Sequence, residues 1–300
     1  MLILRHHRTE AYPGGAANAV NNLADLGAKV VPVGVVGKDA GGRALLEHFR
    51  RKRVGTSGIV TARDWVTTTK TRFLAGWTHT TEQQVLRVDR EPEGTLPEST
   101  QVAVERNARH LSKQADAVLV SDYGLGAATP ALVRKLSAKR IMLDSRYRLR
   151  DYAGAGVTAA TPNEPELEAA YQAQVGTNTR NLDELGQRAL QELEFEALIV
   201  TRGKDGMAVF ESGATRGDGP KGGPARHIPI YGSDAPVDVT GAGDTVIAVF
   251  TLAVAAGASY YEAAHLANYA GGIVVMKRRT ATVTRAELES ALRREATAQR

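Results

Sequence analysis

The chain has 300 residues, a net charge of +5 and no cysteine, and 43% of its residues are hydrophobic and 24% charged. This composition is ordinary for a soluble globular protein, and the lack of cysteine excludes disulfides, thiolate chemistry and cysteine-bound metals. The length favours one large α/β domain with a small appendage. The basic residues are scattered without interleaved aromatic residues, so we expect no nucleic-acid partner and a small acidic ligand such as a phosphate instead.

No apolar run reaches the roughly 18 residues that a membrane span needs. The opening stretch "MLILRHHRTE" has too short an apolar segment for a signal peptide. We therefore expect no membrane partner and a cytoplasmic location.

The first part of the chain reads as a helix, a strand and a helix, followed by a β-rich region. The helices are expected over 16–26 and 40–53, with the strand in "KVVPVGVVG" between them. Residues 58–90 are rich in Thr and Val and partly alternate, which predicts a β-hairpin or small sheet. A helix over 98–114 follows.

The rest of the chain alternates buried strands with helices. The expected strands are "DAVLVSD", "RIMLDS", "GVTAATP", "FEALIVTRG" and "DGMAVFES", the last two paired with each other. The expected helices lie near 130–138, from 163, over 181–193, 241–256 and 259–277, and from Thr284, where Glu287 completes a capping box. The Gly-rich stretch 212–224 is expected to be a mobile loop. This order predicts a mostly parallel sheet covered on both faces, with the ligand at the carboxyl ends of its strands.

The stretch "DVTGAGDT", residues 238–245, stands at the start of an apolar helix. Because Gly241 and Gly243 lack side chains, their backbone amides can converge on an anion together with the helix dipole. Asp244 would lie beside that anion, where a carboxylate can accept the proton of an attacking hydroxyl, and the dipole should keep it ionised. The alternative is an ordinary acidic first turn with glycines that allow close packing.

Two further stretches carry the same ambiguity. In "PGGAANAVNNLADLG", Gly14 and Gly15 let the backbone approach a ligand and Asn18 offers polar groups to sugar hydroxyls; the alternative is a tight turn before a helix. In "TPNEPELE", Asn163 and Glu166 share the first helical turn and could hold the water shell of Mg²⁺. The alternative there is a helix N-cap with an acidic first turn.

Taken together, five stretches occur in a specific order: "PGGAANAVNNLADLG", "SDYGLG", "TPNEPELE", "VTRGKDG" and "DVTGAGDT". In this the chain resembles the PfkB (ribokinase-like) carbohydrate kinases over nearly its whole length. The stretches "QQVLRVDRE", "SDYGLG", "TPNEPELE" and "RRTATVT" are most similar to the kinase half of heptose 7-phosphate kinase and heptose 1-phosphate adenylyltransferase proteins. The resemblance implies a three-layer α/β sandwich over residues 1–300 with a small β lid at 58–90.

The resemblance also implies a catalytic centre and a nucleotide side. Asp244 resembles the catalytic base, and Gly241, Ala242 and Gly243 look like the anion hole for the transferring phosphoryl group. Asn163 and Glu166 match the motif that organises Mg²⁺ and phosphates. The remaining implied nucleotide-side residues are Thr201, Gly203, Gly206 and Asn268. The implied cofactors are ATP and Mg²⁺, with a monovalent cation as a further candidate.

On the substrate side of the implied site, Gly14, Gly15 and Asn18 match the sugar-binding motif. The substrate side is completed by Arg72, Asp122 and Arg146. Of the basic lid residues Lys70, Arg72, Arg87 and Arg90, one could reach the phosphate of a phosphosugar, since Arg presents a fork suited to phosphate; the alternative is solvated lid charges. Arg146 could neutralise phosphate charge or cap a strand end. The implied partners are a sugar or sugar phosphate and a second copy of the chain, paired through the lid.

Three departures separate this chain from its relatives. Relatives open with a strand ending in a sugar-binding aspartate well before the paired glycines, whereas Gly14 lies close to the first residue here; either the start lies upstream or that strand and ligand are lacking. Leu125 replaces the lysine of the heptose kinases, and Arg279 replaces a glycine near the nucleotide. No nucleotidyltransferase His-x-Gly-His motif occurs, so we expect a kinase only.

We therefore expect an ATP-dependent sugar kinase, acting on a phosphorylated heptose or a related sugar. The alternatives are another sugar or nucleoside kinase of the same fold, or a sensor that binds sugar or nucleotide without catalysis. A sensor needs no base, so the joint presence of Asp244, Asn163 and Glu166 favours the kinase.

Overall fold

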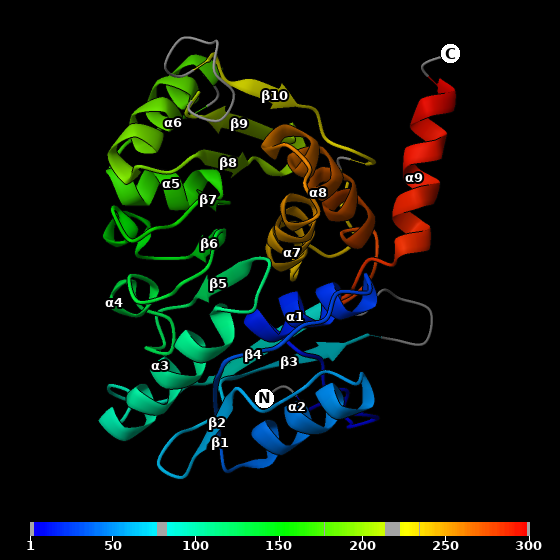
Figure 1. Ribbon diagram of the computed structural model, residues 1–300. Coiled ribbons are helices and arrows are strands. Elements are labelled where there is room, and N and C mark those ends of the chain that lie inside the picture. Colours follow the sequence, from blue (N-terminus) through cyan, green and yellow to red (C-terminus); the bar gives the residue numbers. More distant parts are fainter. Residues whose placement is uncertain (1–2, 77–82, 177, 214–222, 234, 299–300) are drawn as a thin grey trace.

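The computed structural model describes residues 3–76, 83–176, 178–213, 223–233 and 235–298 (Figure 1). The α-helices are α1 (Ala16–Asp25), α2 (Ala40–Arg51), α3 (Glu98–Ser112), α4 (Pro130–Val133), α5 (Glu164–Tyr171), α6 (Thr179–Leu193), α7 (Ala242–Ala255), α8 (Tyr260–Val274) and α9 (Arg285–Ala298). The strands are β1 (Gly34–Gly37), β2 (Ile59–Ala62), β3 (Thr69–Ala75), β4 (Gln83–Arg90), β5 (Val118–Asp122), β6 (Ile141–Ser145), β7 (Ala159–Ala160), β8 (Ala197–Thr201), β9 (Met207–Glu211) and β10 (Arg226–Ile228). Two short 3₁₀ helices are η1 (Leu149–Tyr152) and η2 (Gly203–Asp205).

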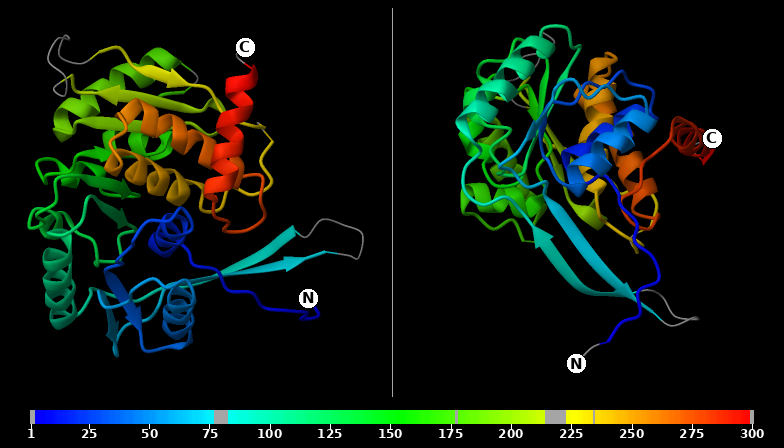
Figure 2. Two further views of the ribbon diagram at one scale, coloured as in Figure 1. Left: turned by 45° about the vertical axis from the view of Figure 1, so that its right-hand side comes forward. Right: turned by 90° about the horizontal axis from the view of Figure 1, so that it is seen from below.

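A six-stranded sheet forms the middle layer, in the order β10-β9-β8-β7-β6-β5. Strands β5 to β8 are parallel, while β9 runs antiparallel to β8. Helices α5 and α6 cover one face and α7 and α8 the other (Figures 1 and 2), which confirms the expected α/β sandwich.

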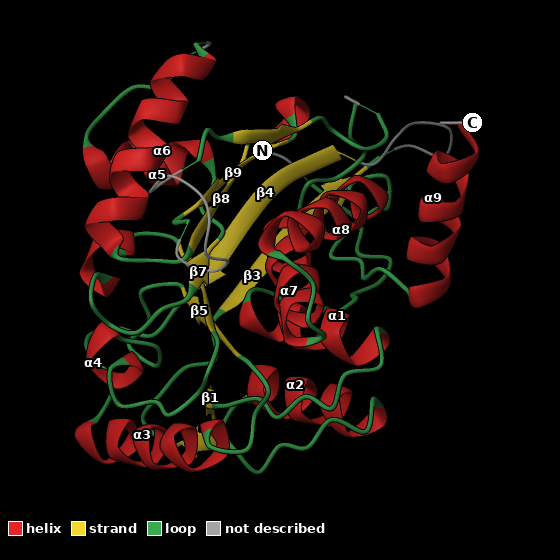
Figure 3. Ribbon diagram, turned by 45° about the horizontal axis from the view of Figure 1, so that its top comes forward, coloured by secondary structure: helices red, strands yellow, loops and turns green. Residues whose placement is uncertain are grey.

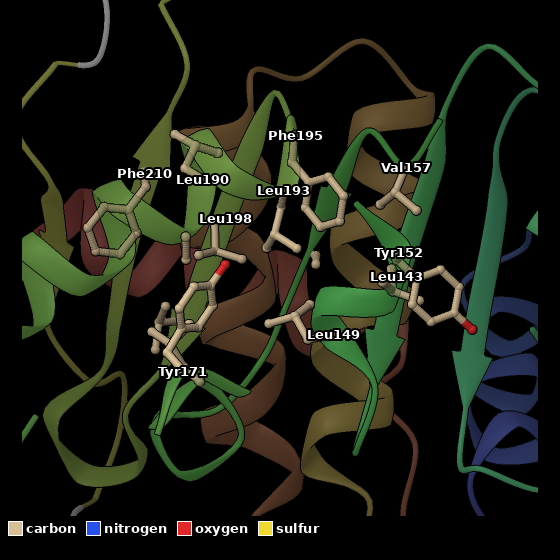
Figure 4. Close-up of a cluster of buried hydrophobic side chains, with 14 of the residues drawn as sticks. Leu143, Leu149, Tyr152, Val157, Tyr171, Leu190, Leu193, Phe195, Leu198 and Phe210 are labelled. Atoms are coloured by element: carbon tan, nitrogen blue, oxygen red, sulfur yellow. The ribbon is translucent and has the colours of Figure 1, made fainter. Parts of the chain in front are cut away.

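Alternation along the strands explains why both faces are covered. In β8, Leu198 and Val200 pack into the cluster under α5 and α6, shown in Figure 4, whereas Ala197 and Ile199 pack under α7 and α8. Each face of the strand therefore needs its own apolar cover. Helix α7, expected to be buried from its apolar sequence, supplies much of the second core.

The β-rich region differs from the expectation in one respect. Strand β2 pairs in parallel with β1, so the hairpin itself consists of β3 and β4, with residues 77–82 between them outside the described part. The hairpin projects from the body (Figure 2), and nearly all its residues are exposed. Figure 3 shows its two strands, β3 and β4, side by side. Most of the expected loop 212–224 also lies outside the described residues.

A cavity of about 3260 Å³ is lined by both the parallel β1–β2 pair and the mixed six-stranded sheet, and it extends to the start of α7. Val35 of β1 and Leu119 of β5 both line it, and no described strand joins these two sheets. Asp122, at the end of β5, and Asp244, at the start of α7, both line the same cavity. Among the described residues, we find no helix with the length and apolar character needed to cross a bilayer.

Candidate active site

The candidate site lies where the carboxyl ends of β5 to β8 meet the start of α7. Asn163, after β7, forms a bridge with Thr201 at the end of β8, and Arg146, after β6, donates its backbone amide to Asp122 at 3.1 Å. Tyr123, after β5, contacts Asp244 of α7. As expected for parallel strands, residues distant in sequence meet at one sheet edge.

Helix α7 begins at Ala242, and the loop before it is fixed by Asp238. The Asp238 carboxylate accepts hydrogen bonds from the amides of Thr240 at 2.9 Å and Arg279 at 2.8 Å. Gly241 is the N-cap with φ of 80°, so the chain turns into the helix through a left-handed residue. The amides of Gly243 and Asp244 belong to the first turn, where the helix itself provides no acceptor, so they are available to an anion.

Asp244 is buried, with 5% of its surface exposed, and is held from two sides. Tyr123 Oη donates to Oδ1 at 2.6 Å and Asn18 Nδ2 donates to Oδ2 at 3.1 Å. Burial raises the pKa of Asp244 to about 6, and the two hydrogen bonds counteract part of that rise. Burial therefore opposes the helix dipole, which is expected to keep Asp244 ionised.

Asp144 and Glu166 are two more carboxylates at this edge, and Asp144 interacts electrostatically with both Asp244 and Glu166. Burial, together with the charges of Asp244, Glu166 and Asp122, raises the pKa of Asp144 to about 7, against the opposing charge of Arg146. Burial likewise raises the pKa of Glu166. The edge therefore carries an excess of negative charge that a cation or Arg146 could offset.

Asn163 is the N-cap of α5. The alternative interpretation of "TPNEPELE", a helix N-cap with an acidic first turn, therefore describes the structure correctly. Asn163 Oδ1 accepts from the Glu166 amide at 2.8 Å, and Glu166 Oε2 accepts from the Asn163 amide at 2.9 Å. This capping box leaves Oε1 of Glu166 for another partner. Described His, Asp and Glu residues nowhere form a group of three that could ligate a metal directly. An ion here would be held through water, which suits Mg²⁺.

The expected nucleotide-side residues form a tightly packed turn. Gly203 is the first residue of η2, which follows β8, and Gly206 comes directly after η2. A side chain at Gly206 would collide with the Ile228 carbonyl. Asn268 is buried and donates to the Pro229 carbonyl at 2.8 Å. Asn268 therefore fixes the segment after β10 through one of its amide hydrogens, and its role on the nucleotide side stays a prediction.

Asn18 also differs from its expected sugar-binding role. Its side chain is fully buried and connects α1 to α7, with Nδ2 donating to Asp244 and to the Gly241 carbonyl at 3.2 Å. Its Oδ1 accepts from Asn22 at 3.3 Å. Asn18 therefore supports the carboxylate, while Gly14 and Gly15 before it line the cavity.

Asp122 is likewise engaged inside the protein. Its carboxylate is 2% exposed and accepts from Arg148 at 2.7 Å, from Tyr152 at 2.7 Å and from the Gly124 amide at 2.9 Å. These donors leave little acceptor capacity for a sugar hydroxyl. We therefore correct Asp122 from a substrate ligand to the residue that holds the loop carrying Tyr123.

Of the expected cationic residues, Lys70, Arg72 and Arg146 line the cavity, whereas Arg87 and Arg90 do not. Against the effect of burial, hydrogen bonds from Thr240 and Arg279 and, least, the charge of Arg72 lower the pKa of Asp238. The exposed Arg146 lies 5.3 Å from the ring centre of Tyr147. Arg279 adopts a left-handed φ of 69°, which explains why a glycine is usual there. Its side chain forms an ion pair with Glu10, so it connects the first residues of the chain to the site.

Tyr123 and Asp144 are the two residues that sequence reasoning missed. Both lie at strand ends within stretches examined for other residues, "SDYGLG" and "RIMLDS". The available signal was their position at a carboxyl edge, where polar side chains gather. What could not be read from sequence is that Tyr123 reaches α7.

The contact between Gly241 and Asn18 gives a stability prediction. A Cβ at Gly241 would lie 2.5 Å from Asn18 Nδ2, in addition to the left-handed backbone. We expect Gly241→Ala to lower the free energy of unfolding by about 1–3 kcal/mol in chemical denaturation. Gly243→Ala is the matched control, since a Cβ there meets nothing within 4 Å and should change stability by less than about 1 kcal/mol. Equal effects of the two changes would refute the packing argument.

Comparison with known proteins agrees with this geometry. Residues 1–286 match the family described as pfkB family carbohydrate kinase. The "Bifunctional protein HldE" of Desulfatibacillum aliphaticivorans is 38% identical over 293 residues, and that of Coxiella burnetii is 37% identical over 288. These alignments cover 95% and 94% of this chain but 56% of each relative, so the chain spans little more than half of their length.

Solved structures share the fold. Escherichia coli phosphofructokinase-2 in complex with fructose-6-phosphate has a TM-score of 0.75 at 17% identity, covering 94% of this chain and 87% of that one. Arabidopsis thaliana ribokinase complexed with ribose and ATP has a TM-score of 0.69 at 19% identity, covering 93% and 87%.

Proposed function

The chain belongs to the pfkB family of carbohydrate kinases, and we propose that it transfers the γ-phosphoryl group of ATP to a hydroxyl of a heptose phosphate. The observation that carries the proposal is Asp244. This buried carboxylate lies in the first turn of α7, beside amides that the helix leaves available. Base and anion site are therefore adjacent, as phosphoryl transfer requires.

In the proposed reaction, Asp244 accepts the proton of the sugar hydroxyl as that oxygen attacks phosphorus. The amides at Gly241 and Gly243 stabilise the charge on the transferring group, whereas the expected contribution of Ala242 is corrected, because its amide already donates to the Val239 carbonyl at 3.2 Å. With a pKa of about 6, Asp244 is mostly ionised at neutral pH and still basic enough to accept a proton. Gly14 and Gly15 lie on the sugar side, where they let the substrate approach the backbone.

ATP with Mg²⁺ supplies the phosphoryl group when bound. The oxygen donors at Asn163 and Glu166 suit a hydrated Mg²⁺, and Thr201, Gly203 and Gly206 offer the neighbouring turn to the nucleotide. Asn268 supports this side by holding the segment after β10. A monovalent cation stays a further candidate cofactor.

The heptose assignment is supported by the similarity to the HldE proteins and by cations around the cavity. Arg72 and Arg146 are the candidates for binding a phosphate already present on the sugar. Leu125 favours a second candidate, a sugar without a phosphate, because an apolar side chain lines the cavity where heptose kinases have lysine.

A sugar panel tests the proposal. The full chain is incubated with ATP, Mg²⁺ and heptose 7-phosphate, heptose, fructose 6-phosphate or ribose, and ADP release is measured. We expect heptose 7-phosphate to have the highest kcat/KM. A preference for free heptose would establish the second candidate, and no turnover on any sugar would contradict kinase activity.

We also propose a cytoplasmic homodimer that pairs through the β3–β4 hairpin. Phe73 and Leu86 are cross-strand partners that are 43% and 54% exposed, and Val88 is 48% exposed. Such a patch on a projecting hairpin marks a protein contact.

Analytical ultracentrifugation tests the dimer. We expect a dimer for the unaltered chain and a monomer for Leu86→Glu, because a charge would be buried in the contact. Val102→Glu, on α3 and 61% exposed, is the control and should stay dimeric. A monomeric unaltered chain, or a dimer unaffected by Leu86→Glu, would refute pairing through this patch.

A further inference from the structure

Tyr123 forms the shorter of the two side-chain hydrogen bonds to the proposed base Asp244. Its Oη donates to Asp244 Oδ1 at 2.6 Å, while Asn18 takes the other carboxylate oxygen. A carboxylate oxygen can accept two hydrogen bonds, so Oδ1 keeps a lone pair for the substrate hydroxyl beside Tyr123. The two fixed donors thus determine how the carboxylate is turned toward that hydroxyl.

The position of Tyr123 is itself fixed from both sides. Its neighbour Asp122 is bound to Arg148 and Tyr152, which anchors the loop to η1. The Tyr123 ring packs on the sugar-side turn, where a Cβ at Gly15 would lie 3.1 Å from Cε2. One side chain therefore contacts both the turn before α1 and the first turn of α7.

We propose that Tyr123 is a positioning residue: it holds the base Asp244 in its ionised, correctly turned form and connects it to the sugar-side turn. This inference rests on the proposed function, in which Asp244 is the base. Burial and nearby carboxylates raise the pKa of Tyr123 far above neutrality, so the phenol stays a donor throughout the working pH range. A permanent donor stabilises the carboxylate over the carboxylic acid.

Loss of the Tyr123 hydroxyl is expected to raise the pKa of Asp244. The hydrogen bond from Tyr123 lowers that pKa against the effect of burial, so removing the hydrogen bond raises it. A Tyr123→Phe variant keeps the other ionisable residues around this edge, which are Asp144, Glu166 and Arg146. A hydrogen bond to a charged group corresponds to about one to two pH units.

The test compares Tyr123→Phe with the unaltered chain in kcat/KM as a function of pH. We expect the acidic limb to move up by about one to two pH units, giving about a 5-fold to 50-fold loss near pH 6 and near-normal values at high pH. Tyr147→Phe, a neighbouring tyrosine that is 68% exposed, is the control and should leave the limb in place. An unmoved limb in Tyr123→Phe overturns the proposal.

A second readout separates this inference from the proposed function. The ¹³C NMR titration of the aspartate carboxyl carbons reports the Asp244 pKa without any turnover, with Asp244→Asn identifying the signal. We expect the signal to titrate at higher pH in Tyr123→Phe. If it does so in a protein that phosphorylates no sugar, the positioning role holds and the kinase proposal fails; an unchanged titration overturns the positioning role in either case.

Discussion

Asp244→Asn is expected to lower kcat by about 100-fold to 10,000-fold, the contribution of a positioned general base. The amide has the same shape and can still accept the Tyr123 hydrogen bond through its oxygen; its nitrogen then faces Asn18 Nδ2, which loses this acceptor but keeps the Gly241 carbonyl. What is lost is the capacity to take a proton. Calorimetric titration with ATP and Mg²⁺ should therefore give a Kd within a few-fold of the unaltered chain.

Asp64→Asn is the matched control, because Asp64 is an exposed aspartate outside the cavity. It should leave kcat unchanged. If Asp244→Asn retained full turnover, the base would have to be another group, and the buried Asp144 would be the first candidate. Loss of nucleotide binding along with kcat would instead indicate a structural role for Asp244.

Arg148→Ala is expected to cause the largest loss of stability, about 3 kcal/mol in the free energy of unfolding. Asp122 is almost fully buried, and Arg148 is its only cationic partner among the described ion pairs, bound through two nitrogens. Its removal leaves a buried carboxylate with only the Tyr152 hydroxyl and the Gly124 amide. Thermal unfolding should show Tm lower by about 6 °C or more.

Arg150→Ala provides the comparison two residues away. Arg150 pairs with Glu192 at 3.6 Å on the surface, with the two side chains 57% and 42% exposed. Such a pair contributes at most about 1 kcal/mol. Similar losses in both variants would contradict the view that Asp122 is the buried anchor of the Tyr123 loop.

Much of the fold was predictable because its signals are local. The apolar run after "GAGD" predicted the buried helix α7, and the alternating region predicted the hairpin. Thr284 and Glu287 form the expected capping box, with the Thr284 amide donating to Glu287 at 2.8 Å. Strand β2 was assigned to the hairpin because its partner β1 lies earlier in the chain, and pairing with a distant strand leaves no local signal.

The residues of the candidate site were easier to predict from the sequence than the hydrogen bonds that their side chains form. The motifs identified Asp244, Asn163 and Glu166, but the direction of each polar side chain depends on tertiary packing. Asn18 and Asn22 lie four residues apart on the buried face of α1, which signals internal hydrogen bonding more than sugar contact. The internal role of Asp122 could not be predicted, because its partner Arg148 lies in the loop after β6, distant in sequence from the end of β5.

The most direct test of phosphoryl transfer with Asp244 as the base is ³¹P NMR of a reaction of the full chain with ATP, Mg²⁺ and heptose 7-phosphate. We expect a new phosphate-ester signal on the sugar that grows with ADP, and its near absence in Asp244→Asn. Release of inorganic phosphate alone, or binding of nucleotide and sugar without any new ester across the sugar panel, would contradict it.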